Sequence, residues 1–267
     1  MKIFIFTYDR FDTIATPKFF EHDNLDYTVL CHTEEAKREF IKAGRVNPRK
    51  IFSSNAPKGL ACNRNFALSQ MEPGEWALFI VDDLVNFYEY EEYETEKSED
   101  LKIVMENAKN YNKKFKKIIS AAKFLERCEE CIKKAEEEKV NLVGFAAFLN
   151  PLFLGKKWKH NVFADGRCWL VKKSNLVFDE NVNSYDDMMW SAMNIKNGGL
   201  IVNQWVIPDC KRYSAGGVGS KEKRMEQKIK DCAYIERLHG DLVYFAKKPG
   251  FPAGSHLRIR NIKNRFN

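Results

Sequence analysis

The 267-residue chain has no apolar stretch that approaches the roughly 20 consecutive residues that a helix needs to cross a bilayer. Its opening run, Met1–Phe6, turns polar at Thr7, which is too early for a secretory signal peptide. The seven cysteines are odd in number and irregularly spaced, which disfavours a disulfide framework and fits free thiols in a reducing compartment. We therefore expect no membrane segment and a cytoplasmic location.

Ligand sets for a structural metal are also scarce. Cys128 and Cys131 form one Cys-x-x-Cys, but no second such pair and no His-x-x-x-His accompanies them. Because structural zinc needs four ligands, we interpret these residues as two cysteines on adjacent turns of a charged helix.

Positive charge exceeds negative charge, with 44 Lys and Arg against 37 Asp and Glu and a net charge of +7. The excess gathers in three clusters interleaved with apolar or aromatic residues, at 113–117, 156–160 and 258–265. Such clusters suit a nucleic acid, since each neutralised phosphate releases condensed counterions. The alternative for each cluster is a solvated lysine-rich face or tail. The candidate contacts to nucleic acid are Lys157, Trp158, Arg258 and Arg260.

The first 87 residues alternate between strand and helix patterns. These patterns predict strands at 2–7, 27–31, 49–53 and 76–81 and helices at 16–22, 34–43 and 59–71. The alternation predicts an α/β fold with a mostly parallel sheet flanked by helices. Ligands of such sheets bind beyond the carboxyl ends of the strands. The polar residues expected at these ends are Thr7, Asp9, Arg10, Asp82 and Asp83.

Residues 88–140 break this alternation. They are heavily charged and contain no Gly or Pro, which predicts an inserted helical hairpin or flap whose buried stripe includes Ile118 and Ile119. A coiled partner helix is the alternative. Strand patterns return at 141–148 and 167–173. We interpret the chain as one domain in three segments, at 1–87, 88–140 and 141–267.

Two acids follow a strongly apolar strand pattern. Trp76–Val81 delivers Asp82 and Asp83 to its carboxyl end, where ionised carboxylates are costly to bury unless a cation meets them. Before this strand, a loop containing Gly59 opens a helix that carries Arg64 and Asn65. This segment resembles the nucleotide-sugar half of GT-A glycosyltransferases, which carry an Asn-x-Gly, an Arg-Asn at a helix start and an acid pair at a strand end.

The resemblance implies a GT-A-like, Rossmann-like fold in which Asp83 binds Mn²⁺ or Mg²⁺ on the diphosphate of a sugar nucleotide and Asp82 assists. Val81 stands where the commoner Asp-x-Asp form has its first acid. A late histidine often completes the metal shell in this family, and His256 is the candidate. Arg64 either binds a phosphate through two of its N–H groups or holds the acids beside it. The donor-binding candidates are Thr7, Asp9, Arg10, Lys58, Arg64, Asp82 and Lys211.

A second acid pair, Asp186–Asp187, begins an amphipathic helix pattern. Simple N-terminal capping behind Ser184 is one explanation, because anionic side chains are favoured at a helix start. GT-A enzymes carry a similar pair in their acceptor half. That resemblance implies that Asp187, with Asp186 as second choice, removes the proton of the acceptor hydroxyl in an inverting displacement.

Three features together resemble the glycosyltransferases associated with TET/JBP oxygenases, found in bacteriophages and in base J synthesis. They are Thr7-x-Asp9-Arg10, the segment 57–65 and the strand that ends on Asp82–Asp83. The resemblance implies transfer from UDP-glucose or a related nucleotide-sugar donor to 5-hydroxymethylpyrimidine in double-stranded DNA. The alternatives are a GT-A enzyme acting on a glycan or lipid-linked sugar, a non-catalytic nucleic-acid-binding protein on this fold, and a nucleotidyltransferase.

Overall fold

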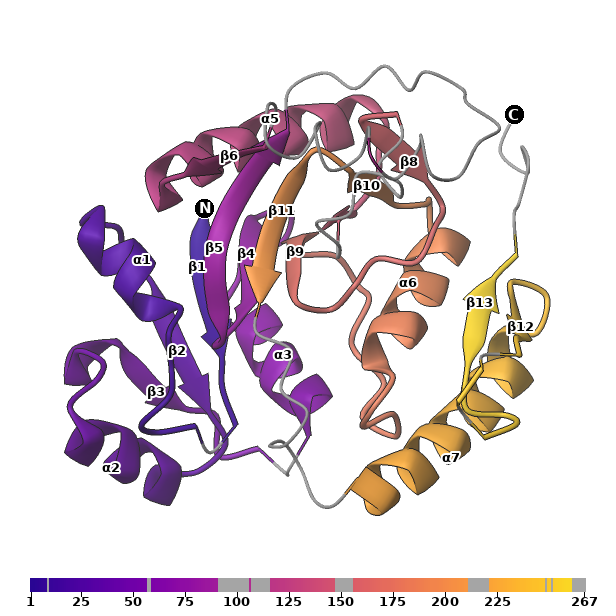
Figure 1. Ribbon diagram of the computed structural model, residues 1–267, viewed down its shortest axis with the longest axis horizontal. Coiled ribbons are helices and arrows are strands. Elements are labelled where there is room, and N and C mark those ends of the chain that lie inside the picture. Colours follow the sequence, from indigo (N-terminus) through magenta and orange to yellow (C-terminus); the bar gives the residue numbers. More distant parts are fainter. Residues whose placement is uncertain are drawn as a thin grey trace.

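The computed structural model describes residues 1–8, 10–56, 59–90, 106, 116–146, 156–210, 221–247, 249–250 and 252–260. The main strands in these ranges are β1 (Lys2–Phe6), β2 (Thr28–Cys31), β3 (Ile51–Ser53), β4 (Trp76–Val81), β7 (Leu142–Phe145), β8 (Trp158–His160), β9 (Cys168–Lys172) and β10 (Ile201–Asn203). They form one eight-stranded sheet in the order β3-β2-β1-β4-β9-β7-β10-β8 (Figure 1). Six strands share one direction, whereas β9 and β8 are antiparallel to their neighbours. The predicted mostly parallel α/β sheet is confirmed.

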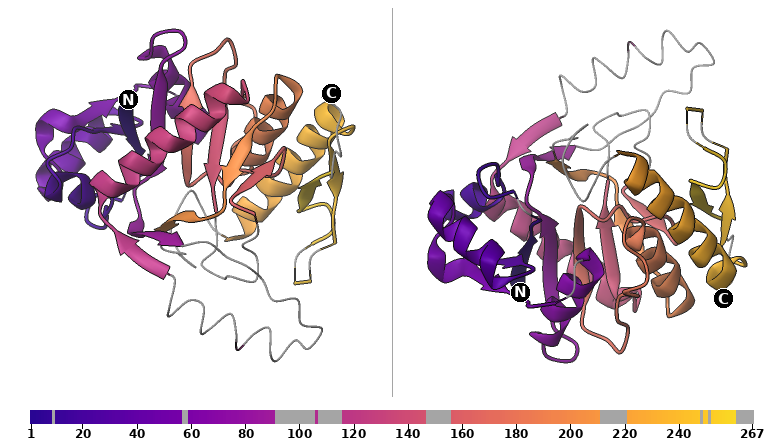
Figure 2. Two further views of the ribbon diagram at one scale, coloured as in Figure 1. Left: turned by 90° about the horizontal axis from the view of Figure 1, so that it is seen from above. Right: turned by 90° about the horizontal axis from the view of Figure 1, so that it is seen from below.

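Helices cover both faces of this sheet (Figure 1 and Figure 2). They are α1 (Pro17–His22), α2 (Glu34–Ala43), α3 (Leu60–Ser69), α5 (Ala121–Glu137), α6 (Asp186–Lys196) and α7 (Lys221–His239), with the 3-10 helix η1 at Pro48–Lys50. Successive strand side chains point to opposite faces, so Ile3 and Ile5 join one buried cluster while Phe4 and Phe6 join the other. The first cluster takes residues from α1, α2 and α5, and the second from α3, α6 and α7.

Local signals fix the ends of these helices. The Thr33 hydroxyl accepts the amide of Ala36 at 3.1 Å and starts α2. The same helix ends at Gly44, whose φ of 65° is left-handed and suits a residue without a Cβ atom. Ser120 starts α5 in the same way as Thr33 starts α2, because its hydroxyl accepts the Lys123 amide at 3.1 Å.

A second sheet corrects the interpretation of residues 88–140. It has the order β11-β5-β6 and consists of β5 (Leu84–Tyr90), β6 (Lys116–Ile119) and β11 (Val206–Cys210). The expected helix is therefore wrong at 88–90 and 116–119 and confirmed along α5, whereas 91–105 and 107–115 lie outside the described residues. Ile118, placed in the buried stripe, is 68% exposed because β6 is an edge strand with one face towards solvent.

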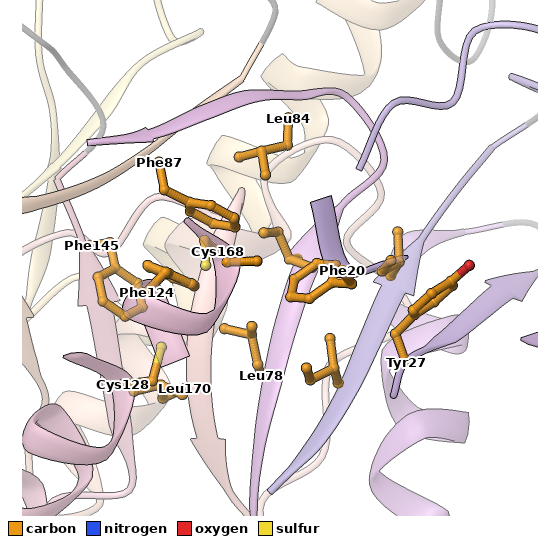
Figure 3. Close-up of a cluster of buried hydrophobic side chains, with 14 of the residues drawn as sticks. Phe20, Tyr27, Leu78, Leu84, Phe87, Phe124, Cys128, Phe145, Cys168 and Leu170 are labelled. Carbon is orange, nitrogen blue, oxygen red and sulfur yellow. The ribbon is translucent and has the colours of Figure 1, made fainter. Parts of the chain in front are cut away.

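Aromatic packing ties this second sheet to the central one. Phe87 of β5 stacks on Phe124 of α5 at 4.1 Å between ring centroids, and Phe145 of β7 completes the group (Figure 3). Cys128 lies in the same apolar cluster and is fully buried, as is Cys131. Both cysteines are free, and their burial in the core explains why this Cys-x-x-Cys motif occurs without further zinc ligands.

A small hairpin lies at the far end of the chain. Strands β12 (Val243–Phe245) and β13 (Leu257–Ile259) pair antiparallel beside α7 (Figure 1). Val243 and Leu257 are buried in the cluster shared by α6 and α7, which fixes the hairpin against that face. Across the described parts of the chain, the helices are all too short or too polar to span a bilayer.

Candidate functional site

The carboxyl ends of β1 and β4 lie side by side, because these strands are parallel neighbours paired along the whole of β1. The chain leaves β1 for β2 on one side and returns in β4 on the other, so the strand order reverses between them. In open α/β sheets such a switch point forms the ligand-binding crevice. Thr7 directly follows β1, and the Asp82–Asp83 turn directly follows β4.

Arg10 binds both acids of this turn. Its Nη1 donates to Oδ1 of Asp82 at 2.6 Å and to Oδ2 of Asp83 at 2.9 Å. The Thr7 hydroxyl donates to the second oxygen of Asp82 at 2.5 Å. The structure thus brings together four of the residues that the sequence assigned to donor and metal binding.

The electrostatics of this first acid pair are dominated by burial. Loss of hydration raises the pKa of Asp82 to about 6, and the charge of Arg10 and the hydrogen bond from Thr7 oppose that rise. Burial also raises the pKa of Asp83, again against the charge of Arg10. Because one arginine serves two carboxylates, the ionised pair keeps a net negative charge that a further cation can neutralise.

The loop after β1 clamps the turn that carries the acids. Thr16 donates its hydroxyl to the Val81 carbonyl at 2.6 Å and accepts the Leu84 amide at 3.0 Å. The Thr16 amide also donates to the Asp82 carbonyl at 3.1 Å. The loop that carries Arg10 and the turn that carries the acids are therefore held as one unit.

The second acid pair lies at the start of α6. The helix begins at Asp186, with Tyr185 at the N-cap position and no side-chain cap. The interpretation of Ser184 as the cap is wrong, because Tyr185 occupies the N-cap position; the Ser184 amide is bound by the Asp231 carboxylate of α7 at 2.6 Å. Asp187 accepts the amide of the next residue through Oδ1 at 2.8 Å, so this acid satisfies one backbone donor of the first turn.

Arg64 of α3 holds this second pair from inside the protein. Its Nη1 donates to Asp186 and its Nη2 donates to the Gly166 carbonyl at 2.7 Å. Its guanidinium carbon lies 4.3 Å from the ring centroid of Trp169 and 5.4 Å from that of Phe178. Arg64 is 1% exposed, so of the two roles expected for it, holding the acids is the one its contacts fit.

The linker loop, residues 165–167, lies between the two acid pairs. Strand β9 is antiparallel to β4 and so begins at the edge where β4 ends. The Val81 amide donates to the Arg167 carbonyl at 3.0 Å, beside the first pair, and the Gly166 amide lies 3.4 Å from Oδ2 of Asp187. Sequence reasoning missed this loop. Its Asp-Gly signals a turn, but nothing in the sequence reveals that β9 runs backwards.

Burial raises the pKa of both members of the second pair, and the charge of Arg64 opposes the rise at both. At Asp187, the negative charges of Asp186 and Asp165 add to the effect of burial and raise the pKa further. Asp187 therefore takes a proton more readily than an ordinary surface carboxylate, which is a property of general bases that work near neutral pH.

A third polar group lies at the ends of β1 and β2 and the start of α3. The Asn63 amide nitrogen lies 3.2 Å from Nε2 of His32, and the Asn63 amide oxygen accepts the Ser54 hydroxyl at 2.5 Å. The Tyr8 ring packs edge-on against His32 at 5.1 Å. We did not predict these four as site residues, although each lies near the end of an expected strand or the start of an expected helix.

The remaining donor and metal candidates are scattered or not described. Asp9, Lys58 and Lys211 lie outside the described residues. His256 precedes β13, and its Nδ1 lies 3.2 Å from the hydroxyl of Tyr185, next to the second acid pair.

The predicted nucleic-acid contacts occupy two different elements. Lys157 and Trp158 lie at β8, the edge strand of the central sheet, with the Lys157 ammonium 5.8 Å from the Trp158 ring centroid. Arg258 lies in β13 and Arg260 just after it, and both are exposed. Figure 1 shows these two elements at separate positions around the molecule.

The oxygen ligands of Asp82 and Asp83 suit a hard cation such as Mg²⁺ or Mn²⁺. Among the described residues, no group of three or more His, Cys, Asp or Glu side chains could hold a metal. Neither Asp83 nor His256 therefore belongs to such a three-ligand group in the described part of the chain. Mg²⁺ usually takes one or two protein carboxylates and completes its shell with water and substrate phosphates. The acids therefore fit a metal shared with a phosphate ligand, and they do not form a closed protein cage.

Comparison with known proteins adds no name to this site. No protein-family model matches the chain, and no curated protein matches it either. The class that the structure defines is an α/β protein with a mostly parallel sheet flanked by helices, compatible with a Rossmann-like fold, and with two carboxylate pairs at one edge of that sheet.

Proposed function

We propose that the chain is a GT-A-like glycosyltransferase, which moves a sugar from a nucleotide-diphosphate donor to a hydroxyl acceptor. One observation carries this proposal: two acid pairs, each bound by one arginine, lie at one sheet edge and are joined by the linker loop. Sugar transfer needs the leaving diphosphate neutralised at one point and the acceptor hydroxyl deprotonated at another. The two pairs suit these two tasks.

The first pair suits the donor. Asp83, assisted by Asp82, would hold Mn²⁺ or Mg²⁺, which when bound neutralises charge on the leaving diphosphate. The Arg10 side chain is 25% exposed beside both acids, so its positive charge lies where it can attract a phosphate. Ligands of open α/β sheets bind at this switch point, which supports a nucleotide-linked donor there.

The second pair suits the acceptor. Asp186 is neutralised by Arg64, whereas the contacts of the half-buried Asp187 carboxylate are backbone amides. Asp187 is therefore the better base. It takes the hydroxyl proton as the new bond to the sugar forms and the bond to the diphosphate breaks on the opposite face, which inverts the anomeric centre.

The acceptor that we propose is 5-hydroxymethylpyrimidine in double-stranded DNA. A net charge of +7 and the basic residues at β8 and β13 favour a polyanionic acceptor. Lys157 also lies 5.8 Å from the ring centroids of both Trp158 and Trp205, which places a cation between two aromatic surfaces that could stack on a base.

The first test is a thermal-shift panel of UDP, GDP, TDP and CMP sugars with and without Mn²⁺. We expect one nucleotide sugar to raise the melting temperature only when Mn²⁺ is present, because a ligand stabilises the state that binds it. Asp83→Asn should abolish this shift, whereas Asp187→Asn should keep it. Stabilisation by none of the donors would contradict the transferase proposal.

Transfer is tested with the donor so identified. A duplex containing 5-hydroxymethylcytosine should gain one hexose mass per modified base, and the same duplex with unmodified cytosine is the matched control. Asp187→Asn should bind donor normally and transfer nothing. Transfer to a glycan but not to the duplex would refute the DNA acceptor and keep the transferase.

A further inference from the structure

We infer that Arg64 is a positioning residue, which locks the start of α6 to the linker loop and thereby fixes the carboxylate of Asp187 at the site. This inference rests on the proposed function for the role of Asp187 as base. Arg64 acts through other residues, because its guanidinium is buried inside the protein and cannot reach a bound substrate.

The contacts of Arg64 tie three elements together. From α3 it reaches Asp186 on α6 and the Gly166 carbonyl in the linker loop. Its guanidinium lies over the rings of Trp169 on β9 and Phe178 before α6. One side chain therefore sets the position of the acid pair relative to the strand that borders Asp82–Asp83.

The cost of this arrangement indicates that it has a purpose other than stability. Arg64 is 1% exposed, and its Nε has no hydrogen-bond partner among the described residues. Buried ion pairs are often no more stabilising than apolar residues of similar volume, and an unpaired buried N–H adds a further penalty. A methionine with an apolar partner would fill the same space more simply. The arginine is needed if the position and charge of the acids matter.

The close approach of the linker loop gives an independent observation. A Cβ atom on Gly166 would lie 2.9 Å from Cβ of Asp187 and 3.3 Å from Nη2 of Arg64. The loop therefore accepts only glycine while Arg64 and Asp187 close on it from both sides. The side chains of Arg64 and Asp187 both contact Gly166, and such a close approach is a usual reason for glycine at a position.

The charges that surround Asp187 make the inference testable by the direction in which its pKa changes. Asp186 on the same helix and Asp165 in the linker loop are negative, and Asp165 is paired with Arg167 of that loop (Nε–Oδ1, 2.6 Å). Arg64 on α3 is positive, and the Tyr185 hydroxyl is neutral at physiological pH. Removing a positive neighbour makes a carboxylate harder to ionise, and removing a negative one makes it easier. A residue with a general packing role alone would not give opposite signs.

The experiment is a carboxyl ¹³C NMR titration of Asp187 in the full chain, with the resonance assigned by its loss in Asp187→Asn. We expect Arg64→Met to raise the pKa of Asp187 by about one pH unit and Asp186→Asn to lower it by about as much. Arg64→Lys keeps the charge, so it should leave the pKa near its wild-type value. Because lysine lacks the planar fork, it should still lose the Gly166 contact and reduce kcat at least tenfold with donor binding unchanged.

The matched control is Arg127→Met, which breaks a half-buried ion pair to Glu89 (Nε–Oε1, 2.6 Å) between α5 and β5. It should leave the titration of Asp187 unchanged. The inference is overturned if Arg64→Met and Asp186→Asn shift the titration in the same direction, or if neither shifts it. If Arg64→Met does not fold, Arg64→Lys decides: a tenfold loss of kcat with unchanged donor binding supports the inference, and wild-type kcat overturns it. Absence of transfer by the wild-type chain would refute the proposed function, while the titration would still report on positioning.

Discussion

The two acid pairs have the same composition, but their arginines differ in access to water. Each consists of two adjacent aspartates and one arginine. Arg10 binds both acids of the first pair, whereas Arg64 binds Asp186 of the second. The Arg10 side chain is 25% exposed, whereas the Arg64 side chain is 2% exposed. An arginine in contact with water can exchange its partners for a ligand, and a buried arginine cannot. The first pair is therefore built to receive charge, and the second is built to stay in place.

The largest difference should appear in stability. We expect Arg64→Met to lower the free energy of unfolding by about 3–5 kcal/mol, because it leaves Asp186 buried without its cation. Arg10→Met should cost less, about 1–2 kcal/mol, because the Arg10 side chain is 25% exposed and water can enter the space it leaves beside the two buried carboxylates. Urea unfolding of both variants measures the two values. Equal losses would show that the difference in exposure has no energetic consequence.

A smaller loss of stability is expected from a single methyl group added in the linker loop. Gly166→Ala places a Cβ atom 2.9 Å from Asp187, so we expect a loss of about 1–3 kcal/mol as the loop is pushed off α6. Gly240→Ala is the matched control, because its Cβ atom would lie 2.8 Å from the Glu236 carbonyl at the end of α7. Gly166→Ala and Gly240→Ala should both be destabilised in urea, but only Gly166→Ala should change transfer by the folded protein. Equal transfer by both variants would show that the linker loop has no role in catalysis.

The first half of the molecule was predictable because its signals are local. The apolar runs of β1, β2 and β4, the Thr33 cap and the Gly44 ending of α2 each depend on residues a few positions apart. They also place Thr7, Arg10 and the Asp82–Asp83 turn at one edge, because all parallel strands present their carboxyl ends there.

The rest depended on pairings between distant segments. Strand β6 has the charged, Gly-free sequence of a helix, and only pairing with β5 makes it a strand. The linker loop reaches the site because β9 runs antiparallel, and direction leaves no mark in a five-residue apolar run. The burial of Arg64 was likewise hidden, since a lone arginine in a helix pattern is usually exposed.

The smallest expected effect is a change in cation affinity at the first acid pair. It tests most directly whether Arg10 can leave its acids. Arg10 and a divalent cation compete for the same two carboxylates, and like charges a few ångströms apart repel. Arg10→Met should therefore bind Mn²⁺ alone more tightly than the wild-type chain, by roughly tenfold for about 1.4 kcal/mol of repulsion removed.

The same variant should bind the nucleotide sugar with Mn²⁺ less tightly, because the diphosphate then lacks one cation. Isothermal titration with each ligand measures both affinities, and Lys123→Met, which removes an exposed pair to Glu126 on α5, is the control. Opposite changes in the two affinities are the signature of an arginine that moves from the acids to the donor. If Arg10→Met weakens Mn²⁺ binding instead, the guanidinium supports the metal site, and the partly exposed Arg10 is as fixed as the buried Arg64.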